Sequence, residues 1–189
     1  MTMRETPSQT AGPYVHIGCL PEHAGLARFY DAQVGASPIA TGAKGAEITI
    51  TGTIIDGMGG LMRDAMIETW QADAAGLFPG EPGADPAVSG FARMACDADS
   101  GAFTLKTIKP GATGGGAPHI SVWIVARGIN IGLQTRIYFE DEVNGSDPLL
   151  SRIDPPQRAG TLIARNAGPG AYRFDIRLRG DGETVFLDL

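Results

Sequence analysis

Apolar and polar residues alternate along most of the chain after residue 46. In the segment 47–55, Ile48 and Ile50 alternate with threonines, and in the segment 102–108 one face carries Phe103, Leu105 and Thr107. The segment 119–126 places Ile120, Val122, Ile124 and Ala126 on one face and His119, Ser121, Trp123 and Val125 on the other. A period of two residues is typical of a β-strand with one buried face.

Further strands are predicted over residues 65–71, 90–96, 133–139, 161–164, 172–178 and 184–187. Glycine and proline, with 27 and 13 residues, supply turns between these segments, as at Asp56 to Gly60. Eight or nine short strands separated by such turns indicate an all-β fold, a β-sandwich with long loops and little helix. The length of 189 residues suits a single domain spanning residues 1–189.

Three segments lack the strand pattern. Residues 1–18 are expected to form an extended N-terminal arm, because two prolines and a glycine within residues 6–17 disfavour a helix. Residues 72–89 are expected to be a long loop, and residues 145–153 a short helix capped by Ser146 or Asp147. The two tryptophans, Trp70 and Trp123, are expected in the core.

Composition excludes several classes of partner. The net charge of −6 argues against a nucleic-acid partner, because no basic stripe is present. The chain contains no run of about 18 apolar residues, so the sequence predicts no membrane-spanning helix. The first residues lack the apolar centre of a signal peptide, so we expect a cytoplasmic protein. Cys19 and Cys96 share no metal-binding spacing and are expected to be reduced thiols.

The segment 119–121 reads His-Ile-Ser. Two histidines in a His-x-His pair on a strand would point the same way and could hold a metal ion. Here Ser121 occupies the second position, and one imidazole with one hydroxyl makes a weak metal site. The pattern therefore indicates that His119 does not hold a metal ion in this chain.

Several motifs, in order, resemble the intradiol ring-cleavage dioxygenases. They are Trp-Gln-Ala at 70–72, Thr-Ile-Lys-Pro-Gly at 107–111 and Pro-His-Ile at 118–120. The stretches at 6–14 (Thr-Pro-Ser-Gln-Thr-Ala-Gly-Pro-Tyr) and 126–131 (Ala-Arg-Gly-Ile-Asn-Ile) are similar to those of alpha chains in heteromeric members. The resemblance covers nearly the whole chain, and it implies an intradiol-dioxygenase-like β-sandwich.

The resemblance implies a non-haem Fe(III) held by two tyrosines and two histidines. This chain has Phe78 at the first tyrosine position and Thr113 or a neighbouring small residue at the second. At the two histidine positions it has His119 and Ser121. Ferric iron prefers anionic oxygen donors, which these residues do not offer. We therefore expect no metal in this chain, and an Fe(III) cofactor held by a partner beta subunit.

The resemblance also implies substrate-binding residues at a site shared with that beta subunit. They are Thr10, Gly12, Pro13 and Tyr14 of the arm, together with Arg127. The assembled enzyme would cleave protocatechuate with O₂ to 3-carboxy-cis,cis-muconate, and this chain alone would be inactive. An arginine suits an aromatic carboxylate, because guanidinium and carboxylate form paired, charge-assisted hydrogen bonds.

Some interpretations stay open from the sequence. Tyr14 could anchor the arm at the subunit interface, and Arg127 could form an interfacial salt bridge. A non-enzymatic β-sandwich binding or scaffold module is the alternative function. A stand-alone dioxygenase with other iron ligands is disfavoured, because the chain has three histidines and no His-x-His pair.

Overall fold

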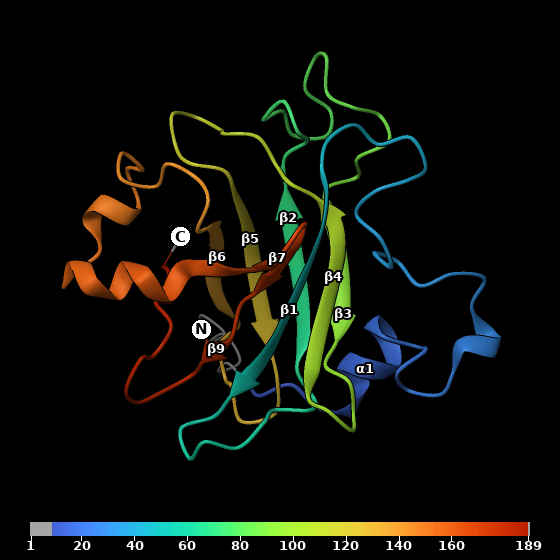
Figure 1. The fold of residues 1–189 in the computed structure, drawn as a ribbon. Helices are drawn as coiled ribbons and strands as arrows, with labels where there is room; N and C mark the ends of the chain where they lie inside the picture. The colour runs from blue at the N-terminus through green and yellow to red at the C-terminus, as the bar shows by residue number, and fades with distance from the viewer. Residues whose placement is uncertain (1–8, 189) are drawn as a thin grey trace, which may run out of the picture.

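The computed structural model describes residues 9–188, and within them the chain is built mainly of nine strands (Figure 1). The all-β prediction is confirmed. The strands are β1 Glu47–Ile55, β2 Met66–Gln71, β3 Phe91–Ala95, β4 Ala102–Ile108, β5 His119–Val125, β6 Leu133–Phe139, β7 Ile163–Gly168, β8 Ala171–Arg173 and β9 Ile176–Arg177. The helical elements are α1 Pro13–Cys19 and three 3₁₀ segments, η1 Ala27–Phe29, η2 Leu150–Arg152 and η3 Pro156–Leu162.

The strands form one hydrogen-bonded path in the order β3-β2-β5-β6-β7-β8-β1-β4, and β9 pairs with β1. This path folds back on itself, so that β1 and β4 lie over β2 and β5 (Figure 1). Strand β7 joins the two layers. It pairs in parallel with β6 through Tyr138 and Ile163, and antiparallel with β8 through Arg165 and Arg173.

The core lies between the two layers and is filled by the inward faces that the alternation predicts. Ile50 and Leu105 of one layer belong to the same buried cluster as Ile67, Ile120 and Ile124 of the other. Each such side chain, 0–3% exposed, contributes about 1.5–3 kcal/mol by its removal from water. The alternation therefore fixes which face of β5 remains outside the core.

The prediction that both tryptophans lie in the core is wrong. Trp70 and Trp123 are 42% and 36% exposed. On β5, Trp123 lies between buried Val122 and Ile124, so the period of two turns its ring to the opposite face. Ring size suggests burial, but the position in the alternation decides it.

A buried amide links the two layers through hydrogen bonds. The side chain of Gln71, on β2, is 1% exposed. Its Oε1 accepts from the Thr107 hydroxyl at 2.7 Å, and its Nε2 donates to the Ile108 carbonyl at 3.0 Å. Both partners lie on β4, across the core. This satisfied polar link fixes how the layers are aligned, because an apolar contact alone has no direction.

The prediction of an extended arm is wrong over residues 13–18, which form α1. Residues 1–8 of the predicted arm lie outside the described residues. Pro13 occupies the start of the helix, where its missing N–H costs no hydrogen bond and its fixed φ suits the helical turn. Proline excludes a helix only from positions further along it. No helix within residues 9–188 is long and apolar enough to cross a membrane.

Gly52 provides a test of the packing between β1 and the C-terminal strands. A Cβ at this position would overlap the Phe174 carbonyl oxygen and lie 2.6 Å from the Phe103 ring. We predict that Gly52→Ala lowers the free energy of unfolding by about 2–4 kcal/mol. Urea denaturation measures this. Gly145→Ala is the matched control, because nothing lies within 4 Å of its added Cβ. Equal losses in the two variants would contradict the packing shown here.

Candidate functional site

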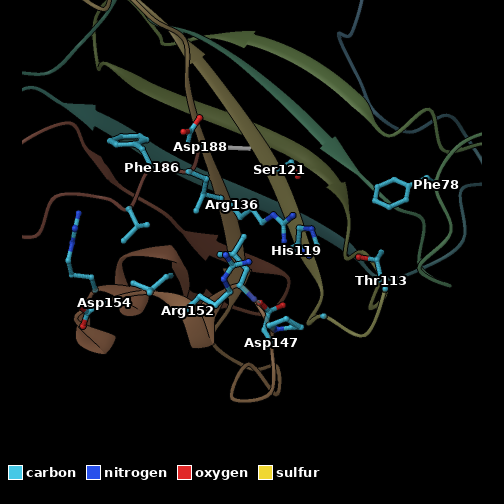
Figure 2. A pocket seen from close by; sticks show the side chains of 18 residues that line it. Phe78, Thr113, His119, Ser121, Arg136, Asp147, Arg152, Asp154, Phe186 and Asp188 are labelled. Carbon is cyan, nitrogen blue, oxygen red and sulfur yellow. Dashed lines mark hydrogen bonds between the residues drawn. The ribbon is translucent and has the colours of Figure 1, made fainter.

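A cavity of about 710 Å³ opens at the end of the sandwich where β5 begins. Phe78, Thr113, His119 and Ser121 all line it, so the structure brings together the four positions that the resemblance singled out (Figure 2). His119 and Ser121 share one face of β5, two residues apart. Phe78 and Thr113 come from the loops that precede β3 and β5. How these loops are held decides the shape of the cavity.

The loop that carries Phe78 is organised by the buried carboxylate of Asp73. Its Oδ1 accepts from the amides of Ala75 at 2.8 Å and Leu77 at 2.9 Å, and its Oδ2 accepts from Asp85 at 2.8 Å. Burial by itself would raise the pKa of Asp73, but these three amide donors lower it overall. The carboxylate thus binds amides spread over about a dozen residues of the loop. These hydrogen bonds hold the predicted long loop in a defined conformation.

The carboxylate of Asp147, which lines the cavity, also accepts hydrogen bonds from backbone amides. It is 2% exposed. Its Oδ2 accepts from the Ala117 amide at 2.8 Å, and its Oδ1 accepts from Leu149 and Leu150 at 2.9 and 3.0 Å. The last two bonds lie at the start of η2, a short 3₁₀ segment within the helix predicted over residues 145–153; the predicted cap is wrong, because the N-cap residue is Leu149 and not Ser146 or Asp147.

Close approach of the glycine-rich turn makes this arrangement possible. A Cβ on Gly116 would lie 2.8 Å from Asp147 Oδ2. The Tyr138 hydroxyl also donates to Asp147 Oδ1, at 3.2 Å. Burial opposes ionisation of Asp147, yet the pKa of its carboxyl is lowered overall by the amides and by this phenol. The carboxylate is therefore charged and fully engaged with donors.

His119 is held as a neutral imidazole. Burial lowers the pKa of His119, and the nearby Arg136 lowers it further, although the hydrogen bond to Ala117 and the charge of Asp147 act in the opposite direction. Its Nδ1 lies 2.9 Å from the Ala117 carbonyl oxygen, which can only accept. Nδ1 therefore carries the proton, and Nε2 is left as an acceptor.

Arg136 is a cavity residue to which the sequence analysis gave no role. It lies on β6 directly opposite Ser121 of β5 in the antiparallel register. His119, Ser121 and Arg136 lie close together in Figure 2. The Nη1 of Arg136 donates to the Tyr138 hydroxyl at 3.3 Å. The pairing of the two consecutive strands, if aligned from their hydrophobic patterns, would have pointed to this residue.

The cavity does not fit the Fe(III) that the family implies. Phe78 has no donor atom, and the Thr113 and Ser121 hydroxyls are neutral. The Arg136 guanidinium places a positive charge beside the one imidazole. Within residues 9–188, no group of three or more His, Cys, Asp or Glu side chains could hold a metal ion. The donor set is thus wrong in both number and charge.

The predicted substrate residues lie elsewhere, around a second cavity of about 260 Å³. Gly12, Pro13 and Arg127 line it, together with His16, His23, Asp64 and neighbouring residues of the arm. Thr10 ties the arm down: its hydroxyl accepts from the Gly128 amide at 2.7 Å and lies 3.4 Å from the Ala126 carbonyl oxygen. Tyr14 does not line this cavity, and its side chain is 86% exposed.

Arg127 is available to a ligand or a partner. Its side chain is 74% exposed, and its Nε lies 3.8 Å from Asp64 Oδ2, a long contact between solvated groups. Such a pair contributes about 0–1 kcal/mol. Among residues 9–188, most of the guanidinium donors of Arg127 have no protein acceptor.

The two cavities lie at opposite ends of β5. His119 begins this seven-residue strand and Arg127 follows its last residue. A strand of that length extends about 20 Å. Residues 9–18 of the arm and Arg127 therefore do not line the larger cavity of their own chain.

The chain is similar to several known proteins over most of its length. A family model described as "Dioxygenase" matches residues 31–180. The chain is 46% identical over 194 residues to the protocatechuate 3,4-dioxygenase alpha chain of Pseudomonas putida, covering 97% of this chain and 96% of that protein. It is 40% identical over 200 residues to the alpha chain of the same enzyme from Burkholderia cepacia, covering 100% and 99%.

The chain is also similar to a beta chain and to a solved structure. It is 31% identical over 160 residues to the protocatechuate 3,4-dioxygenase beta chain of Burkholderia cepacia, covering 74% of this chain and 67% of that protein. The dioxygenase domain of a dioxygenase–carbohydrate-binding fusion protein from Streptomyces sp. SirexAA-E superposes with a TM-score of 0.57 at 26% identity, covering 79% and 88%. The predicted intradiol-dioxygenase-like fold is thus confirmed.

We predict that the purified chain, alone, holds no stoichiometric iron, because three of the four positions lack a usable donor. Metal analysis after loading with ferrous or ferric salt and desalting measures this. About one tightly held iron per chain would contradict our description of the cavity.

Acid should loosen the loops that Asp73 and Asp147 hold. Both carboxyls have a pKa below the ordinary 3.8, so the stability they contribute is present above that value and is lost as the pH falls through their folded pKa values. We predict that Asp73→Asn is less stable at pH 7 by about 1–3 kcal/mol and loses less stability than the unmodified protein below pH 4. Melting temperatures across this range measure both effects. The exposed Asp99→Asn is the control and should change neither.

Proposed function

The chain belongs to the intradiol dioxygenase family, and we propose that it is the alpha-type subunit of an alpha–beta enzyme that cleaves protocatechuate. One observation carries this proposal. The cavity at the family's ligand positions has lost its donors, whereas the arm and Arg127 form a separate set at the other end of β5. The arm and Arg127 can take part in the reaction only if another chain supplies the metal.

The intradiol dioxygenase family uses non-haem iron. We propose that a beta-type partner holds this Fe(III), since the similarity to a beta chain indicates a common sandwich from which both subunits derive. The complete enzyme would insert both atoms of O₂ between the two hydroxyl-bearing carbons of protocatechuate and release 3-carboxy-cis,cis-muconate. This chain alone would have no activity.

The proposed role of this chain is to bind and orient the substrate. Arg127, exposed and weakly paired, is suited to the substrate carboxylate, because its planar guanidinium donates two parallel hydrogen bonds. Gly12 and Pro13 bring backbone close to the ring, and Thr10 fixes them to the turn that carries Arg127. Tyr14, exposed on the first turn of α1, offers its phenol to the substrate or to the partner.

The charge of the chain supports a local role for this arginine. At a net charge of −6, the overall field of the chain repels an organic anion. Attraction of a carboxylate therefore depends on nearby cations. A cytoplasmic location is also part of the proposal, and it is supported by Cys19 and Cys96, both of which are free thiols.

Co-expression with a beta-type chain tests the proposal. We expect ring cleavage of protocatechuate by the co-purified pair and none by this chain alone. A non-enzymatic scaffold would instead give no change in activity when this chain is omitted.

Arg127→Ala tests the role of the guanidinium within that complex. We predict that kcat/KM for protocatechuate falls about ten- to a hundredfold, since a hydrogen-bonded contact to a charged group is worth about 1.5–3 kcal/mol. Turnover of catechol, which lacks the carboxylate, should fall much less. Arg165→Ala, an exposed arginine on β7, is the control. Iron content and assembly are checked in each variant, and equal losses for both substrates would assign Arg127 to the interface.

A further inference from the structure

We propose that the larger cavity of this chain binds a small organic carboxylate, with Arg136 as its anchor. The cavity measures about 710 Å³, within the range of sites that hold a small ligand. This inference goes beyond the proposed function, because it concerns a cavity that the proposed reaction does not use. It depends on the charge, the hydrogen bonding and the apolar lining of the cavity.

Arg136 has hydrogen-bonding capacity that the protein does not use. Its Nε is buried and has no hydrogen-bond partner, and one Nη1 contact, to the Tyr138 hydroxyl at 3.3 Å, is long. Within residues 9–188 it forms no salt bridge with any carboxylate. The Nη2 group forms no hydrogen bond within residues 9–188, so it can donate to an acceptor that a ligand supplies.

The acidic residues of the cavity do not take this role. Asp147 is separated from Arg136 by the Tyr138 hydroxyl, which donates to it, and its oxygens already accept from three amides. Asp154 and Asp188 line the cavity but are exposed, where water screens their charge. Within residues 9–188, the Arg136 guanidinium therefore has no carboxylate in salt-bridge contact with it.

The other polar groups beside Arg136 narrow the class of ligand. Ser121, directly opposite in the register, offers a hydroxyl that can donate to the same carboxylate. His119 is neutral with Nε2 as an acceptor, so it suits a ligand hydroxyl rather than a second anion. Two further cations line the cavity: Arg152 of η2, which is exposed, and Arg158 of η3, which is paired with Glu183 at 3.4 Å.

The remaining lining is largely apolar and suits the body of an organic acid. It includes Phe78, Pro148, Leu149, Ile153, Val185 and Phe186. Aromatic and aliphatic side chains beside the Arg136 guanidinium favour an arenecarboxylate over an inorganic anion such as sulfate. A hydroxyl on the ring would meet the His119 acceptor.

Equilibrium dialysis with radiolabelled 4-hydroxybenzoate tests this, using the purified alpha–beta complex or, if no partner associates, the chain itself. The readout is the number of sites per copy of this chain, so failure of the catalytic proposal does not affect it. We expect one site that belongs to this chain in the unmodified protein. Arg136→Gln should weaken that site at least tenfold, and Arg136→Lys should retain part of the affinity.

Ser121→Met provides a second variant that fills the cavity without removing the charge, and it should also abolish the site. Arg165→Gln, outside the cavity, should leave binding unchanged. Circular dichroism verifies the fold of each variant, and a crystal structure with the ligand locates it. The proposal is overturned if the unmodified protein shows no such site, if Arg136→Gln and Ser121→Met both bind as before, or if the ligand lies elsewhere.

Discussion

The conformation of the loops around the larger cavity depends on buried carboxylates that accept hydrogen bonds from backbone amides. Asp73 and Asp147 are 3% and 2% exposed and each accepts from three amides of the surrounding chain. A loop packed against a sandwich contains backbone amides that have no partner in a strand or helix. Leaving these buried amides without an acceptor is costly. One charged group placed among several amides solves this locally. The two carboxylates thereby determine where Phe78 and the glycine-rich turn lie.

The sandwich contributes rigid spacing rather than chemistry. Because the inner face of β5 is buried in the core, its outer face has a fixed direction, and His119 and Ser121 stay in one cavity. The same rigidity keeps Arg127 at the far end of the strand. The two cavities are therefore separate and cannot enclose one small ligand.

The lining of the larger cavity is unsuited to a metal cation. Its Phe78 and Ser121 offer no anionic donor, and Arg136 brings a positive charge bonded to the Tyr138 hydroxyl. A guanidinium repels a metal cation and attracts an anion, so this lining disfavours a bound metal cation. The engaged Asp147 and the neutral His119 leave this charge uncompensated.

The sequence alone determined the all-β class, most strand positions and the inward faces. The alternation of apolar and polar residues is a local property of the chain, and it shows directly which face of a strand is buried. The pattern on one strand also brought out His119 and Ser121, and the resemblance to the intradiol dioxygenases added Phe78 and Thr113. Only the tertiary structure decided that Arg136 faces Ser121, because strand register depends on two segments at once. It likewise placed Asp147 beneath the glycine-rich turn. The helix at Pro13 was missed because the effect of proline depends on its position within the turn. Contacts between distant residues leave no periodic signal along a chain, so they emerge only when it folds.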